Sequence, residues 1–216
     1  MQSLGPSTSP QKIFRNLRFS CRRCAPRLEA ADLTSKVTPY LTTLVARMAA
    51  QEAAHDARLD ATAENYVLDD DLNLALGDVV ARALLCVNRD RKHPSFIAAF
   101  PTAPSAAAQD VSSDAQSRYV RLAIAALRAD AVFASISAEV DGLEVKLNAL
   151  EAGRANRDAL WETEQLARQQ TASAAEAARL AFNTIHPTLK LLYPGRKGLV
   201  RSFFLREDSE PNTKAE

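Results

Sequence analysis

Residues 156–185 read NRDALWETEQLARQQTASAAEAARLAFNTI, and this stretch decides the fold class. Most of it is alanine, leucine, glutamate, arginine and glutamine, which are good helix formers, and it contains no glycine or proline. Mostly small residues recur at spacings of three and four, which predicts one face of a long helix with coiled-coil packing. Because these side chains are small, a neighbouring backbone can approach closely. The positions are Leu160, Glu164, Ala167, Thr171, Ala174, Ala178, Ala181 and Ile185.

The same spacing predicts three further helices earlier in the chain. The first begins between Thr34 and Pro39 and ends near Tyr66; the second begins at the N-cap Asp69. The third spans 114–152 and is ended by Gly153. β-branched runs are scarce, which disfavours a sheet. We therefore predict an all-α, antiparallel four-helix bundle-like arrangement of two long helical hairpins, each followed by a short helix.

The predicted domain organisation follows from where glycine, proline and serine gather. PTAPSAAAQDVSS (101–113) has the composition of an exposed connection between the two hairpins. The predicted parts are a basic, disordered extension (1–30), a helical domain (31–206) and a disordered tail (207–216). Inside the domain we expect a hairpin (34–101), a linker (102–113), a second hairpin (114–194) and a short helix (197–205).

The first 28 residues are rich in arginine and contain no acid, because the first carboxylate is Glu29. They include a short amphipathic stretch, from Lys12 to Phe19. The rest of the chain carries about −5, which does not favour a general nucleic-acid binder. Two interpretations of the extension are an organellar transit peptide and a start codon assigned too far upstream. A third is binding to nucleic acid or a membrane surface.

A short pattern occurs twice, 93 residues apart. His93-Pro94 is followed after five residues by Phe100-Pro101, and His186-Pro187 by Tyr193-Pro194. In each copy the histidine is expected to cap a short helix that begins at proline, after which the aromatic side chain packs down. The two hairpins are then either duplicates or matched by chance. A further interpretation is that the two histidines form a symmetric catalytic or metal-binding pair.

Glu52 and His55 have the Glu-x-x-His spacing that places two metal ligands on one helical face, as in ferritin-like di-iron bundles. Glu164 is a possible third ligand from the fourth helix. A second Glu-x-x-His is missing from the sequence. The metal site is therefore one interpretation, and a His–Glu hydrogen bond inside the bundle is the other.

The three cysteines do not form a disulfide framework and indicate a reducing, cytoplasmic setting. Cys21-x-x-Cys24 is half a zinc site, a redox pair or an incidental pair, and the neighbouring Arg22 and Arg23 are expected to lower the thiol pKa. Cys86 is expected to be a small core residue.

The C-terminal segment 194–206 combines aromatic and basic residues. Val200, Phe203 and Phe204 fall on one side of the expected short helix. They either cover an end of the bundle or bind a partner. Trp161 is expected to be a structural anchor near the second hairpin turn.

The remaining motifs do not favour an enzyme. The sequence contains no nucleotide-binding glycine loop and no nucleophile elbow, and no catalytic residue or cofactor is assigned. No segment is long and apolar enough to span a membrane. We therefore expect a non-enzymatic structural or protein-interaction helical bundle that binds a protein partner or itself. The alternatives are a metal-binding bundle and binding to nucleic acid or a membrane surface through the basic extension.

Overall fold

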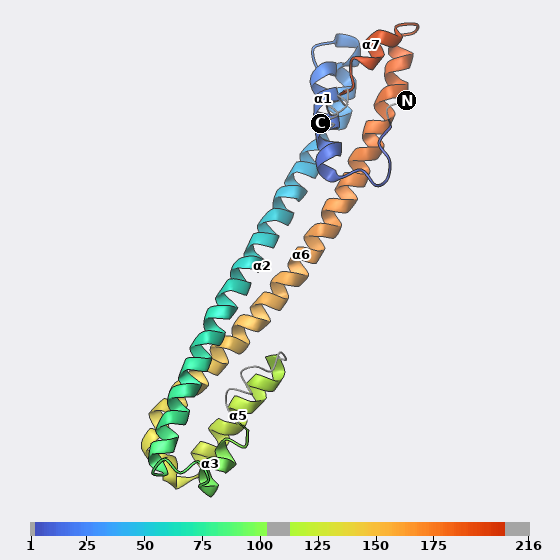
Figure 1. Cartoon of the computed structure of the whole chain (residues 1–216). Coiled ribbons are helices and arrows are strands. Elements are labelled where there is room, and N and C mark those ends of the chain that lie inside the picture. Colours follow the sequence, from blue (N-terminus) through green and yellow to red (C-terminus); the bar gives the residue numbers. More distant parts are fainter. Residues whose placement is uncertain (1–2, 103–112, 206–216) are drawn as a thin grey trace, which may run out of the picture. The chain divides into compact units, whose positions relative to one another are not determined.

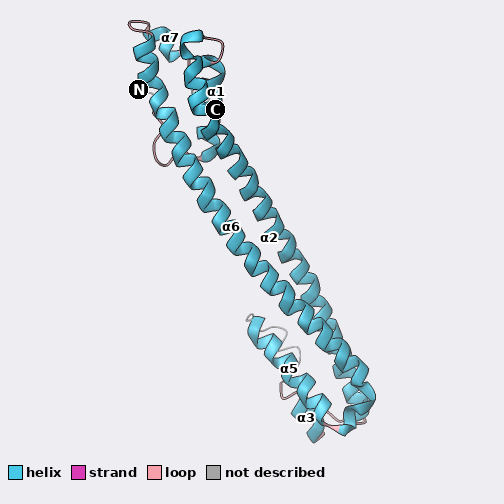
Figure 2. Cartoon of the chain, turned by 180° about the vertical axis from the view of Figure 1, so that it is seen from behind, coloured by secondary structure: helices cyan, strands magenta, loops and turns pink. Residues whose placement is uncertain are grey.

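The computed structural model describes residues 3–102 and 113–205, and within these ranges every regular element is a helix (Figures 1 and 2). The all-α prediction is confirmed. No helix in the described ranges has a stretch that is both long and apolar enough to cross a bilayer. Of the predicted linker (102–113), residues 103–112 lie outside the described residues, as does the whole predicted tail (207–216). The elements are α1 (Pro10–Cys24), η1 (Leu28–Ala30), α2 (Ala31–Cys86), α3 (Pro94–Ala99), α5 (Ser113–Ala129), η2 (Ala131–Ile136), α6 (Ser137–Leu192) and α7 (Lys197–Arg201).

The chain divides into two compact units, and each long helix contributes to both. Unit 1 comprises residues 1–55 and 163–216, and unit 2 comprises residues 56–162. Unit 1 therefore contains α1, η1, α7, the N-terminal part of α2 and the C-terminal part of α6. Unit 2 contains the other parts of α2 and α6 together with α3, α5 and η2.

In unit 2, α2, α5 and α6 enclose one apolar core, and α3 and η2 contact α5. The core residues recur at helical spacing on all three helices, as the sequence predicts. They are Leu72, Leu76, Val79 and Ala83 of α2, Val120, Ile124 and Leu127 of α5, and Val140, Leu143, Leu147 and Leu150 of α6. Phe96 and Phe100 close the core, with ring centroids 5.1 Å apart.

The predicted helix ends near Tyr66 and at Gly153 are wrong, because α2 and α6 each continue for 56 residues. Gly153 lies inside α6, where α2 comes very close. A Cβ on Gly153 would lie 2.5 Å from Oδ1 of Asn65 and 2.8 Å from Cδ1 of Leu68. Asn65 donates from Nδ2 to the carbonyl of Gly153 at 3.1 Å. The glycine therefore serves close helix packing within unit 2.

The first copy of the repeated pattern forms as predicted, and the second does not. α2 ends in a Schellman motif, with Asn88 and Arg89 at positive φ and the Arg89 N–H donating to the Leu84 carbonyl at 2.7 Å. His93 then caps α3 by accepting from the Ser95 N–H at 3.3 Å. Pro187, by contrast, lies inside α6, so the second copy does not begin a helix. The local structure therefore does not support duplication, which was one of the two interpretations of the pattern.

In unit 1, residues 10–24 form α1, although the sequence analysis assigns them to a disordered extension. Ser9 caps α1, and Pro10 occupies its first turn. Ile13, Leu17 and Cys24 recur on one side of the helix and are buried. Burying them gives the helix the tertiary packing that a short arginine-rich peptide lacks alone. The core beneath α1 contains Leu33, Val37 and Leu44 of α2, Ala178, Phe182, Ile185 and Leu189 of α6, and Val200, Phe203 and Phe204 near α7.

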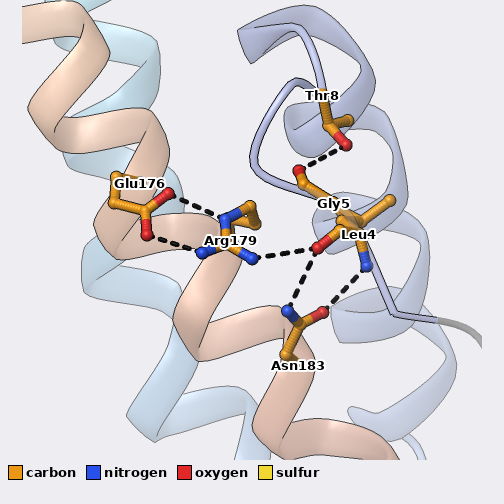
Figure 3. A network of polar contacts seen from close by, with 6 residues as sticks. All are labelled: Leu4, Gly5, Thr8, Glu176, Arg179 and Asn183. Carbon is orange, nitrogen blue, oxygen red and sulfur yellow. Dashed lines mark hydrogen bonds and ion pairs between the residues drawn. The ribbon is translucent and has the colours of Figure 1, made fainter.

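The segment before α1 is fastened to α6 by polar contacts (Figure 3). Asn183 accepts from the Leu4 N–H at 2.9 Å and donates back to the Leu4 carbonyl at 3.2 Å. Arg179 donates to the same carbonyl at 3.0 Å and is itself held by Glu176. Both backbone groups of Leu4 are thus satisfied by one side of α6, which fixes the approach to α1.

Candidate functional site

The predicted metal ligands are brought together only in part. His55 Nδ1 lies 3.0 Å from Glu164 Oε1, and Arg168 Nε donates to the same oxygen at 3.0 Å. Glu164 is almost fully buried in unit 1, whereas Glu52 is exposed. The predicted His–Glu hydrogen bond is therefore confirmed, with a guanidinium beside it that was not predicted.

This donor set does not suit a metal ion. The charge of Glu164 is already shared with Arg168, which repels a cation from the same oxygen. Across residues 3–102 and 113–205, no group of three or more His, Cys, Asp or Glu side chains is arranged to hold a metal. Glu164 is best explained as a buried carboxylate satisfied by two donors.

Cys21 and Cys24 are free and buried on the inner side of α1. Burial raises the pKa of both thiols, and the neighbouring Cys21 helps to raise that of Cys24 to about 11, against an opposing effect of Arg27. The predicted lowering by Arg22 and Arg23 is wrong, because both point to the exposed side of the helix. Neither thiol is activated as a nucleophile or a zinc ligand.

Val200, Phe203 and Phe204, expected either to cover an end of the bundle or to bind a partner, are buried beneath α1. Phe204 meets Phe182 edge to face at 5.7 Å, and Phe203 stacks on Tyr193 at 5.9 Å. α7 ends at Arg201, and the following turn carries the two phenylalanines into the core. Their burial removes the exposed apolar surface on which the predicted binding role depends.

α1 presents a second side that carries only basic charge. We call Lys12, Arg15, Arg18, Arg22 and Arg23 the basic face; all five are exposed, and α1 contains no acid. In the part of the chain that the structure describes, Arg15, Arg18 and Arg22 have no carboxylate partner. Arg23 donates to the carbonyl and the hydroxyl of Ser202, which are neutral acceptors. Arg15, Arg18 and Arg22 therefore carry charge that no carboxylate among the described residues compensates.

The end of unit 1 next to the basic face adds four exposed cations, Lys190, Arg196, Lys197 and Arg201. Among the described residues, two acids lie at the same end. Asp32 pairs with Lys36 at 2.7 Å, and Glu29 accepts from the neutral Tyr193 hydroxyl at 3.2 Å. The described cations therefore outnumber the described acids at this end, which favours a positive potential.

The two units have opposite net charge. Unit 1 contains 16 of the 27 basic residues and 9 of the 26 acids, which leaves unit 2 with 11 basic residues against 17 acids. The near-neutral total of the sequence conceals this separation, because the units are discontinuous in the chain. The sequence shows a basic N-terminus and a separate basic segment at 194–206, and the fold places both in unit 1.

Arginines also gather in unit 2, but carboxylates accompany them. Arg128 bridges Asp141 and Glu144 at 2.6 Å each, and Arg121 pairs with Glu151. The groove between α5 and α6 is lined by Arg118, Arg121, Arg154 and Arg157, and also by Glu151 and Asp158. Arg121 and Arg128 thus join α5 to α6, whereas the arginines of the basic face point away from their unit.

Trp161 is not the predicted anchor, because its side chain is 54% exposed on α6. The helix continues through residue 161, so the turn it was expected to pack against does not exist.

Comparison with known proteins gives no family assignment: no protein-family model, no curated protein and no solved structure matches the chain. Function must therefore be argued from the chemistry of its own residues. The basic face carries three exposed arginines of one helix that have no carboxylate partner among the described residues. The amphipathic stretch from Lys12 to Phe19 was its signal in the sequence; the buried positions that continue to Cys24 show that the same helix is held in place.

Proposed function

We propose that this chain is a non-enzymatic interaction protein that docks onto a negatively charged surface through the basic face of α1. The observation that carries the proposal is the division of α1 into a buried apolar side and an exposed basic side without acids. Core packing and the contacts to Leu4 hold the helix in place, so little backbone entropy is lost when the face binds.

The spacing of the charges favours an extended partner over a small anion. Lys12 and Arg23 are separated by about 17 Å along the helix axis at 1.5 Å per residue. A single phosphate or carboxylate contacts two or three donors at one point. A surface with many negative charges contacts the whole face at once and gains from every arginine.

Binding of fluorescently labelled heparin, measured by anisotropy over a series of salt concentrations, tests the proposal. We expect tight binding at low salt that weakens steeply as salt rises. Replacing Arg15, Arg18 and Arg22 by glutamine should weaken binding about tenfold or more and flatten the salt dependence. These side chains are exposed, so the fold should survive.

The matched control removes three exposed cations from unit 2, by Arg91→Gln, Lys92→Gln and Arg118→Gln. It changes the net charge by the same amount and should leave heparin binding nearly unchanged. Equal weakening by both triple variants would mean that only total charge matters, and the proposal would fail.

A protein partner or a second copy of the chain is included among the negatively charged surfaces, because unit 2 is acidic. Light scattering at low and high salt identifies the second copy: a dimer that dissociates as salt rises is the expected sign of unit 1 binding to another chain's unit 2. The three cysteines, which form no disulfide framework in the sequence, support a cytoplasmic setting.

A further inference from the structure

Three exposed leucines lie at the end of unit 1 among its cations. Leu28 is 93% exposed and Leu191 is 82% exposed, and Leu192 is partly exposed beside it. The hydrogen bond from Tyr193 to Glu29 brings the residues next to Leu28 and Leu192 into contact. Figure 1 shows the connection from α1 to α2 and the end of α6 at the same end of this unit. We call Leu28, Leu191 and Leu192 the apolar tip.

From this juxtaposition we infer that the negatively charged surface is an anionic lipid bilayer, into which the apolar tip inserts while the surrounding cations contact the headgroups. This inference rests on the proposed function, because it names the partner of the same basic surface. Shallow insertion of apolar side chains combined with basic residues is how proteins bind a bilayer interface without crossing it.

The charges around the tip fit this geometry. Arg22, Arg23, Lys190, Arg196 and Lys197 are exposed there, and long basic side chains reach headgroups while their carbon chains lie against the interface. The two acids described nearby are fewer than these cations: Asp32 is paired with Lys36, and Glu29 keeps its charge while it accepts from the neutral Tyr193 hydroxyl. Nucleic acid offers the same negative charge, but its phosphate backbone does not provide an apolar layer for three leucines.

Exposed leucine alone does not define such a site, and unit 2 provides the comparison. Leu74 and Leu122 are also exposed, at 71% and 65%, but they belong to the acidic unit. An anionic bilayer repels that unit, so these leucines should not insert. They are therefore matched controls for the leucines of the tip.

The test is co-sedimentation with phosphatidylcholine vesicles that contain about 30 mol% phosphatidylserine, compared with vesicles of phosphatidylcholine alone. We expect the chain to bind the anionic vesicles and not the neutral ones. The double variant Leu28→Ser, Leu191→Ser should lose about a hundredfold in vesicle affinity and keep its heparin affinity. The control Leu74→Ser, Leu122→Ser should change neither.

Insertion itself is read by fluorescence, because Trp161 is the sole tryptophan of the sequence. In a Trp161→Phe background, Leu191→Trp should shift its emission to the blue on anionic vesicles and be quenched by brominated acyl chains. Thermal unfolding of every variant confirms that the fold is kept.

The outcomes separate the two proposals. If the leucine variant binds vesicles as well as the parent, or if the new tryptophan is not quenched, the bilayer inference is wrong while docking through the basic face stands. Binding to heparin or duplex DNA without binding to anionic vesicles also overturns the bilayer as partner. If nothing negatively charged is bound at low salt, both fail.

Discussion

The arginines of α1 in unit 1 and those of α5 in unit 2 differ in what surrounds them. Arg121 and Arg128 of α5 form ion pairs with carboxylates of α6, which neutralise their charge and link the two helices. Arg15, Arg18 and Arg22 of α1 face outward without such partners in the described residues. The number of basic residues alone therefore does not locate a docking surface. What locates it is whether the fold has already neutralised them.

The most disruptive test of the comparison is to release α1 from its unit. Leu17 is fully buried on the inner side of α1, and Leu17→Ala should lower the free energy of unfolding by about 2 to 5 kcal/mol, because apolar burial is lost and a cavity is left. Urea unfolding measures the loss. Cys21 and Cys24 should at the same time become reactive toward a thiol reagent, and heparin binding should weaken because the basic face is no longer held. The exposed Leu122→Ala should change stability by about 0.5 kcal/mol or less.

In unit 2, α2 and α6 approach each other closely at Gly153. Gly153→Ala places a methyl group against Asn65 and Leu68 and should destabilise the protein by about 1 to 3 kcal/mol. Gly142 lies in the same helix, and a methyl group there would have no neighbour within 4 Å, so Gly142→Ala should stabilise by about 0.5 to 1 kcal/mol. Equal effects of the two substitutions in thermal unfolding would contradict the packing assigned to Gly153.

The sequence predicted the helices and most of their buried positions, but not how far α2 and α6 extend or where α1 packs. Helical periodicity gave the all-α class and most of the core, because each buried position repeats every three or four residues. The continuity of α2 and α6 was not predicted. Glycine commonly follows the last turn of a helix, so Gly153 was taken as a helix end. Its packing role becomes visible only when α2 lies beside it. The docking of α1 was missed because it depends on a core built from residues some 180 positions away, such as Phe203, whose carbonyl accepts from Ser20 at 2.9 Å. The His55–Glu164 contact was anticipated, but Arg168 beside it was not.

Substitution of single arginines should distinguish those in ion pairs from those without a described carboxylate partner by the change in the free energy of unfolding. Arg121→Gln breaks an exposed ion pair and should cost about 0.2 to 1 kcal/mol. Arg15→Gln breaks none and should leave the free energy of unfolding unchanged, or raise it slightly by relieving repulsion within the basic face. Chemical denaturation of both variants at low salt is the measurement, and a larger loss for Arg15→Gln would reverse the comparison.

Acidification should have the smallest effect of these tests. It should lower the stability of the fold and leave the charge of the basic face unchanged. Hydrogen bonds from Arg128 and Arg179 hold the pKa of Glu144 and of Glu176 below the usual 4.5. A carboxyl group whose pKa is lower in the folded than in the unfolded chain stabilises the fold at pH values above the unfolded-state pKa. This stabilisation is lost as the pH falls through the folded-state pKa. Thermal stability should therefore decline below about pH 4.5, whereas heparin affinity at about pH 5 should equal that at pH 7, because arginine does not titrate there.

The reactivity of individual arginines tests the central claim most directly. Phenylglyoxal modifies exposed arginine side chains, and mass spectrometry gives the rate for each one. Arg15, Arg18 and Arg22 should react quickly and become protected when heparin is added, while Arg121 and Arg128 should react slowly with or without it. Equal rates in the two units, or heparin protection confined to unit 2, would contradict the assignment of the docking surface to α1.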